Sequence, residues 1–400
     1  MLIRFANFTP PIALENAAAL IPVIREVFGT WDFQAIETSA TAPEISVRHS
    51  AGRYAIDSPW LEETAQDTTE VGAACCLSID LVRSFIEADL SLLCLHCAAI
   101  EVDGRLIVFP TTVRSGKSTL CVRLAAEGLR VFADDMLPID AEGRGLALGI
   151  APRLRIPLFD AVKPNMRAFI DAHAGPRDRR YLYLSLPATY LAAHGETAPI
   201  GAFVFLDRQS AGAAALTRIG RDEGLAGLLR QNIAETRSAV DNLDRLIALM
   251  QQIPVFTLRY ADLDEAVHAL LDGVSFDCLA RSSMSPPERT TMGEGGSRAL
   301  AEPLARRRRG KAYIQADGVT LRDLNGALFL VSDGDTATFH LNPVAAGLWR
   351  LLEEPVTVAE AAAVLRAAFP DADSDALGRD ARRTFDALRR SALIRSVDNV

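Results

Sequence analysis

Two apolar runs of strand type dominate the hydrophobic pattern near residue 100. They read "CLHCAAIEV" and "RLIVFP", and Asp103-Gly104 between them is a strong signal for a two-residue β-turn. Such a turn pairs Val102 with Arg105, and the same register continued along both strands sets His96 opposite Thr111. The pattern therefore predicts a hairpin that brings His96 beside the segment following the second strand.

A helix and another strand are predicted next. Residues 118–127 have a helical pattern that Gly128 ends, and "LRVFADDMLPI" is an apolar run interrupted by the acidic pair Asp134 and Asp135. A strand, helix and strand in succession form a right-handed parallel unit, so both strands end at the same edge of the sheet. We therefore expect the start of the helix, the acidic pair and His96 to meet at one edge.

The end of the chain has a separate pattern. Two short strands, "GALFLVS" and "TATFHLN", flank a turn at residues 333–335, and helical patterns follow at residues 343–353, 358–369 and 375–391. Thr357 and Glu360 have the spacing of a capping box.

The last helix has a stripe predicted to be buried, formed by Leu377, Ala381, Phe385 and Leu388. Its arginines off that stripe are Arg379, Arg382, Arg383, Arg389 and Arg390. They form either a solvated basic face or a groove wall that attracts an acidic peptide.

The composition of the chain predicts where it divides into domains. Residues 281–311 are rich in Ser, Pro, Gly and Arg and have no apolar period, which predicts a flexible linker. We expect a mixed α/β region at 1–90 in which no motif is recognised, a domain at 91–280, and a small domain at 312–400. The arginine run at 306–309 is interpreted as solvated linker charge, with a nucleic-acid or sorting patch as the alternative.

Bulk properties narrow the class of protein. The 400 residues are 49% hydrophobic and 23% charged, which is typical of a globular chain with a substantial core. The net charge of −9 argues against bulk binding of nucleic acid. No apolar stretch reaches the length of a membrane span, and the first residues do not have the pattern of a signal peptide. The six cysteines are unevenly placed, so we expect no disulfide framework. We expect a cytoplasmic protein; homo-oligomerisation stays open.

The segment "FPTTVRSGKST" carries the clearest chemistry. Its second half matches the end of a phosphate-binding loop, although Thr111 stands where glycine is usual. Lys117 would reach the β- and γ-phosphates of ATP, and the Ser118 hydroxyl would ligate Mg²⁺. Backbone N–H groups would hold the phosphates at Thr112, Val113, Arg114, Ser115, Gly116, Lys117, Ser118 and Thr119. An aspartate of the acidic pair would hold the metal or accept a proton.

The stretch "LHCAAIEVDGRLIVFPTTVRSGKSTLCVRLAAEGLRVFADD" resembles the core of kinases related to HPr kinase/phosphorylase. The resemblance extends loosely through "RRYLYLSLP" and "GAFVFLDR", and is closer to the enzymes encoded with peptide-modification systems. It implies a P-loop α/β kinase core in which His96 orients an acid/base aspartate. Asp134 and Asp135 would divide the roles of metal ligand and base, with Asp135 favoured as base. The Glu-x-x-Gly signature of bifunctional HPr kinases is missing, so phosphorolysis is not expected.

The stretch "FHLNPVAAGLWRLLEEPVTVAEAAAVLRAAFP" resembles PqqD-like domains. The resemblance implies a small α+β winged-helix module that recognises a leader peptide, which adds as a strand to the sheet edge beside the last helix. Combined, the two resemblances predict an ATP- and Mg²⁺-dependent kinase. It would phosphorylate a Ser or Thr of a ribosomal peptide or small carrier protein.

Two alternatives stay open. One is a weakly catalytic nucleotide-sensing module that presents a leader peptide to a partner modifying enzyme. The other is a DNA-binding regulator, which the net acidity disfavours. Arg153, Arg155, Arg179 and Arg180 could contact phosphate or substrate, but we expect them at the surface.

Overall fold

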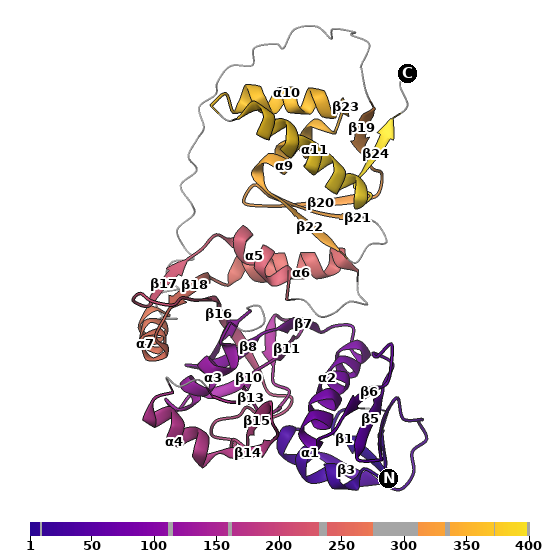
Figure 1. Ribbon diagram of the computed structural model, residues 1–400, viewed down its shortest axis with the longest axis vertical. Coiled ribbons are helices and arrows are strands. Elements are labelled where there is room, and N and C mark those ends of the chain that lie inside the picture. The colour runs from indigo at the N-terminus through magenta and orange to yellow at the C-terminus, as the bar shows by residue number, and fades with distance from the viewer. Residues whose placement is uncertain are drawn as a thin grey trace. The chain divides into compact units, whose positions relative to one another are not determined.

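The computed structural model describes residues 1–8, 10–110, 115–158, 162–231, 238–274, 311–332, 337–371 and 373–397. The chain divides into two compact units, and each is described by itself (Figure 1). The first comprises Met1–Arg237 and Leu246–Phe276, and the second comprises Ser238–Arg245 and Asp277–Val400. Apart from residue 311, the expected linker lies outside the described residues.

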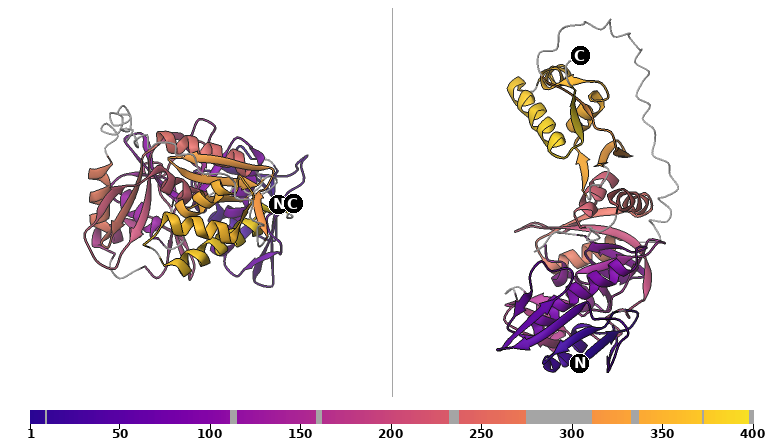
Figure 2. Two further views of the ribbon diagram at one scale, coloured as in Figure 1. Left: turned by 90° about the horizontal axis from the view of Figure 1, so that it is seen from above. Right: turned by 90° about the vertical axis from the view of Figure 1, so that its right-hand side faces the viewer.

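The first unit begins with a six-stranded mixed sheet, drawn in indigo near the N-terminus (Figures 1 and 2). Its strand order is β3-β1-β2-β4-β5-β6. Its strands are β1 Leu2–Phe5, β2 Ile12–Glu15, β3 Phe33–Ile36, β4 Ile45–Ser50, β5 Arg53–Asp57 and β6 Ala65–Asp67. Buried positions alternate along β1, β2, β4 and β5, so one face packs on the helices while the other meets solvent. The helices are η1 Ala18–Leu20, α1 Ile21–Val27 and α2 Glu70–Ala88. The expected mixed α/β character of this region is confirmed.

The core of this region extends beyond residue 90. Buried side chains of β1, β2 and α2 share one cluster with Cys94, Leu148, Ala151 and Tyr183. Residues 1–90 and the segment carrying the candidate loop therefore pack as parts of the same unit.

A nine-stranded sheet forms the centre of the first unit. Its main path runs β10-β8-β9-β16-β12-β11-β7, and β18 pairs with both β16 and β17. The strands are β7 Leu93–His96, β8 Ala98–Val102, β9 Arg105–Phe109, β10 Arg130–Ala133, β11 Met136–Ile139, β12 Arg144–Leu146, β16 Thr197–Arg208, β17 Ala215–Arg218 and β18 Val255–Tyr260. The helices are α3 Lys117–Ala125, α5 Arg221–Leu229, α6 Ala239–Gln252 and α7 Leu263–Gly273. The two compact units divide within α6.

The predicted hairpin is present, but it is shorter than expected. The β8–β9 ladder runs from Val102 opposite Arg105 to Ala98 opposite Phe109, as the turn at Asp103-Gly104 requires. The chain then leaves this ladder at Cys97, and β7 pairs with β11, which sets His96 opposite Met136. The pairing of His96 with Thr111 is therefore wrong, because the apolar run "CLHCAAIEV" is two strands in different ladders.

The predicted parallel unit is confirmed in direction. β10 is antiparallel to β8, and β8 is antiparallel to β9, so β10 and β9 run the same way with β8 between them. Gly128, at φ 93°, ends the turn after α3 as expected. Asp134 and Asp135 follow β10, at the edge of the sheet where β9 leads towards α3.

A small antiparallel sheet completes the first unit. It is formed by β13 Arg153–Arg155, β14 Ala174–Arg177 and β15 Tyr181–Leu184, in the order β13-β15-β14, and α4 Pro164–Ala172 precedes β14.

From residue 311 onward, the described part of the second unit has two three-stranded sheets and three helices. The strands are β19 Ala312–Gln315, β20 Val319–Leu324, β21 Ala327–Ser332, β22 Thr338–Leu341, β23 Val356–Thr357 and β24 Ile394–Val397. One sheet is ordered β20-β21-β22 and the other β23-β19-β24. The helices are α9 Pro343–Leu351, α10 Val358–Ala368 and α11 Ser374–Arg390, close to the predicted bounds. The predicted capping box is present, and the predicted stripe of α11 is buried. The turn at residues 333–335 lies outside the described residues.

Candidate functional site

The end of the loop is built around a glycine in the left-handed region. Gly116, at φ 95°, is the N-cap of α3, and its carbonyl accepts the Leu120 N–H at 2.9 Å. A Cβ at this position would lie 2.8 Å from the Tyr260 hydroxyl, so both the backbone and the space require glycine. Thr112, Val113 and Arg114, which we expected to bind nucleotide, lie outside the described residues.

Lys117 is buried at the start of α3, with 8% of its surface exposed. Its Nζ lies 3.4 Å from His96 Nε2. Burial lowers the pKa of Lys117, and neighbouring Cys97, Asp135 and Asp134 only partly oppose this effect. The expectation that His96 lies beside the loop therefore holds, although β7 brings it there by pairing with β11.

The two carboxylate oxygens of Asp134 differ in their contacts with the described residues. Its Oδ2 accepts the backbone N–H of Arg153 at 2.9 Å, whereas Oδ1 is buried and has no hydrogen-bond partner among the described residues. Burial raises the pKa of Asp134 to about 6, even though the Arg153 N–H and the nearby Ser118 hydroxyl act to lower it. A buried lone oxygen beside Ser118 fits a cation ligand, because an unpaired buried carboxylate oxygen is costly.

Asp135 has the opposite surroundings. Its Oδ1 lies 3.0 Å from His96 Nε2, and its Oδ2 accepts from Arg153 Nη2 at 2.9 Å. Burial acts to raise the pKa of Asp135, but the His96 hydrogen bond and the charges of Arg153, His96 and Lys117 outweigh it and lower the pKa. Asp135 is therefore an ionised carboxylate at neutral pH.

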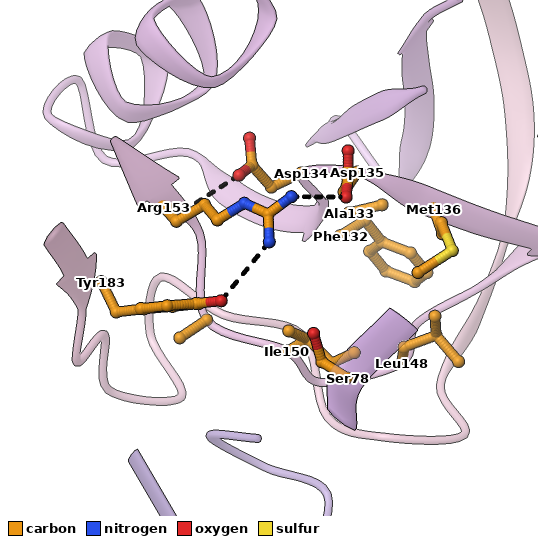
Figure 3. Close-up of a pocket in the computed structure, with 11 residues that line it drawn as sticks. Ser78, Phe132, Ala133, Asp134, Asp135, Met136, Leu148, Ile150, Arg153 and Tyr183 are labelled. Atoms are coloured by element: carbon orange, nitrogen blue, oxygen red, sulfur yellow. Dashed lines mark hydrogen bonds and ion pairs between the residues drawn. The ribbon is translucent and has the colours of Figure 1, made fainter. Parts of the chain in front are cut away.

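Arg153 joins the two carboxylates, which we did not expect of a residue assigned to the surface. Its backbone and its guanidinium contact Asp134 and Asp135 respectively, and Nη1 lies 3.5 Å from the Tyr183 hydroxyl (Figure 3). The same nitrogen lies 2.6 Å from Cys75 Sγ. Arginines at 153 and 155 alternate with Leu154, and tyrosines alternate in the same way at 181 and 183. In the sequence, this alternation indicates that the arginines share one face of their strand and that the tyrosines share one face of theirs.

Two cavities adjoin the acidic pair. The larger, of about 300 Å³, is lined by His96, Ser115 to Thr119, Asp135, Arg153, Leu154, Arg155, Pro157, Leu158, Met166, Tyr181 and Arg208. The smaller, of about 30 Å³, has room for about one water and is lined by Ser78, Asp134, Asp135, Arg153, Tyr183 and apolar side chains (Figure 3). The structure thus brings the described members of the expected site together, with Asp134 at its buried side.

Oxygen ligands for a metal are few here. Within the described ranges there is no cluster of three or more His, Cys, Asp or Glu side chains arranged to hold an ion. A divalent cation at Ser118 and Asp134 would therefore depend on oxygens of a phosphate ligand and on water, which is how Mg²⁺ is commonly held.

The second unit has a groove of its own. It has a volume of about 1110 Å³ and lies between β22, the outer strand of its sheet, and α11. Apolar side chains such as Phe339, Val344 and Leu388 line it, and its charged lining comes from α11: Asp380, Arg383, Asp386, Arg389 and Arg390. An outer strand beside a helix can accept an extended peptide as an additional strand.

Comparison with known proteins identifies a PqqD domain near the C-terminus. Residues 328–394 match the family model of PqqD, described as coenzyme PQQ synthesis protein D. The C-terminal PqqD-like prediction is therefore confirmed, and the match covers β21, β22, α9, α10 and α11. No curated protein matches the chain. The resemblance of the preceding region to HPr-kinase-related enzymes has no family or relative behind it and stays a prediction. None of the helices in the described ranges combines the length and apolar character needed to cross a membrane.

Proposed function

We propose that this protein is an ATP-dependent phosphotransferase that acts on a Ser or Thr hydroxyl of a peptide or small protein recruited by its PqqD domain. One observation carries the proposal. Lys117, Ser118 and Asp135 line a single cavity with His96, and the adjacent Asp134 has a buried Oδ1 with no hydrogen-bond partner among the described residues. Each residue type matches a need of phosphoryl transfer: a cation for the phosphates, oxygens for the metal and a group to take a proton.

The proposed roles follow from the contacts. Lys117 and the N–H groups at the start of α3 would bind the β- and γ-phosphates, and Ser118 with Asp134 would hold Mg²⁺. Bound MgATP supplies the transferable phosphoryl group. The fit rests on the buried Oδ1 of Asp134, which has no partner among the described residues and lies on a residue close to Ser118.

Asp135 would take the proton of the acceptor hydroxyl. It is ionised and accessible from the cavity, with 37% of its side chain exposed. Arg153 and His96 fix the two oxygens, and as the acceptor O–P bond forms, the hydroxyl proton passes to a carboxylate oxygen. The bond between the γ-phosphorus and the leaving ADP oxygen would break, and the negative charge of this oxygen would stay on the ADP phosphates near Lys117.

One feature favours a second function. Both oxygens of Asp135 are already engaged, and its lowered pKa makes it a weak base. A nucleotide-sensing module, which binds ATP without transfer and presents a peptide to a modifying enzyme, would have this arrangement.

Two variants test nucleotide binding and phosphate transfer separately. Lys117→Met keeps the buried aliphatic stem and removes the charge, so we expect MgATP binding, measured by calorimetry, to fall at least about 100-fold. Asp135→Asn should keep ATP affinity within a few-fold and lower phosphate transfer by about 100-fold or more, because general-base contributions have that size. Transfer is measured by mass spectrometry on peptides encoded beside the gene.

The outcomes are distinct. Unchanged ATP affinity in Lys117→Met removes the nucleotide site from this cavity. If wild-type protein binds ATP but phosphorylates no such peptide, the sensing function replaces the kinase.

A further inference from the structure

The pair of strands β13 and β15 presents arginines and tyrosines on one face. Arg153 lies opposite Tyr183, and Arg155 lies opposite Tyr181. Side chains two residues apart on a strand point to the same side, so all four share a face. At the inner end of this row Arg153 holds Asp135, and one step outward Arg155 and Tyr181 line the same 300 Å³ cavity.

The cavity has a positive balance in an acidic protein. Among the described residues, four cationic side chains line it, Lys117, Arg153, Arg155 and Arg208, against one carboxylate, that of Asp135. The whole chain has a formal net charge of −9. A local excess of this sign attracts an anionic ligand.

Arg155 is a cation of this cavity to which the proposed chemistry gives no role. It lies on β13, and it forms no ion pair with any described residue. Its guanidinium lies over the Tyr181 ring at 5.8 Å from the centroid, and that of Arg153 lies over the same ring at 5.1 Å. Tyr181 therefore positions Arg155 without neutralising it, since a cation over an aromatic face keeps its hydrogen-bond donors.

We propose that Arg155, positioned by Tyr181, binds a carboxylate of the acceptor near the reacting hydroxyl. This subsite rests on the proposed phosphotransferase function and names its substrate class: a hydroxyl residue with an acidic group one or two residues away. Two residues along β13 span about 7 Å, which is the reach between a hydroxyl and a carboxylate so spaced on an extended peptide. A planar guanidinium also matches a carboxylate in two-point hydrogen bonding.

The test measures binding, so that it does not depend on transfer. The full-length protein is saturated with Mg²⁺ and a non-hydrolysable ATP analogue, and capped peptides are titrated with NMR detection. Ala-Glu-Ser-Glu-Ala is compared with Ala-Gln-Ser-Gln-Ala, and a third peptide, Ala-Gln-Ser-Gln with a free C-terminus, separates side-chain from terminal carboxylates.

The matched control variant is Arg180→Gln. Arg180 also lies over Tyr181, at 5.7 Å, but it pairs with Asp67 at 3.0 Å and does not line the cavity. We expect wild type and Arg180→Gln to bind the Glu peptide about tenfold more tightly than the Gln peptide. Arg155→Gln should bind the two within about twofold and keep its affinity for the ATP analogue.

Equal binding of the Glu and Gln peptides by wild type overturns the proposal, as does an acid preference that survives Arg155→Gln. Loss of ATP-analogue affinity in Arg155→Gln also overturns it, because the arginine would then serve the nucleotide. If the preference behaves as expected but no hydroxyl is phosphorylated, the kinase function fails and the carboxylate subsite stands.

Discussion

Asp134 and Asp135 are adjacent residues with opposite pKa shifts. Asp134 is almost fully buried, and burial dominates its pKa, whereas His96 and Arg153 stabilise the charge of Asp135. The two pKa shifts differ because the two carboxylates have different hydrogen-bond partners. A buried carboxylate oxygen without a partner has little to offset its lost hydration. In the absence of metal, the pair therefore combines one carboxyl that resists ionisation with one that favours it.

This difference predicts a pH dependence of stability. The pKa of Asp134 is about 6 in the folded state, against an ordinary value of 3.8 that applies to the unfolded chain. The stability that protonated Asp134 contributes is therefore fully present below about pH 4 and is lost as the pH rises through about 6. Asp134→Asn cannot ionise. We expect wild type to lose up to about 3 kcal/mol relative to this variant between pH 4 and pH 7, measured by chemical denaturation in chelator.

Asp135→Asn is the control for this prediction. The lowered pKa of Asp135 means that its charge contributes stability above about pH 4, which is lost only as pH falls further. Its difference from wild type should therefore stay constant from pH 5 to pH 7. A constant difference for Asp134→Asn as well would contradict the burial argument.

At the residue scale, the sequence could predict which side chains lie near one another, whereas their chemical roles stay predictions. The Ser-Gly-Lys-Ser-Thr segment and the acidic pair that follows a strand indicated Lys117, Ser118, Asp134 and Asp135, and three of these line one cavity. Arg153 could not be predicted in this way, because its role depends on β13 lying beside the acidic pair, a contact made between segments with no shared motif. Side-chain partners set by tertiary packing leave little trace in a single sequence.

At the scale of elements, local rules were the most informative. The turn at Asp103-Gly104, the stop at Gly128 and the buried stripe of α11 depend on neighbouring residues, and all were predictable. The division of "CLHCAAIEV" into β7 and β8 was not. Both pieces are apolar and buried, so their pattern does not reveal that the chain changes ladders at Cys97.

The capping box of α10 gives a prediction at this scale. The Thr357 hydroxyl accepts the Glu360 N–H at 3.2 Å, and the Glu360 carboxylate accepts the Thr357 N–H at 2.8 Å. Thr357→Ala removes the first bond and should lower local stability by about 1–2 kcal/mol. Hydrogen exchange of α10 amides should then quicken about 5- to 30-fold.

Thr357→Ser is the matched control, because it keeps the hydroxyl that caps the helix. Exchange in this variant should stay within a few-fold of wild type. Equal acceleration in both variants would assign the effect to the lost methyl group of Thr357, whose side chain is buried, and not to the cap.

For the whole molecule, composition predicts a division near residue 300. Limited proteolysis should cut between residues 281 and 311, because the Ser-, Pro- and Gly-rich segment there has too few apolar residues to form a core. Mass spectrometry should find two fragments that resist further digestion. Cleavage that begins elsewhere, or a chain that stays intact, would contradict a linker at this position.

The outer strand β22 has a consequence for the protein in concentrated solution. An uncovered strand edge invites pairing between copies, and long flat edges lead to aggregation. β22 has only four residues, Thr338–Leu341, and the charged helix α11 lines the space beside it. So short an edge provides roughly two to four backbone hydrogen bonds, too few to join two chains without side-chain contacts. Because β22 is so short, a peptide ligand must also bind through its side chains. For the same reason, we expect that the protein does not self-associate through this edge.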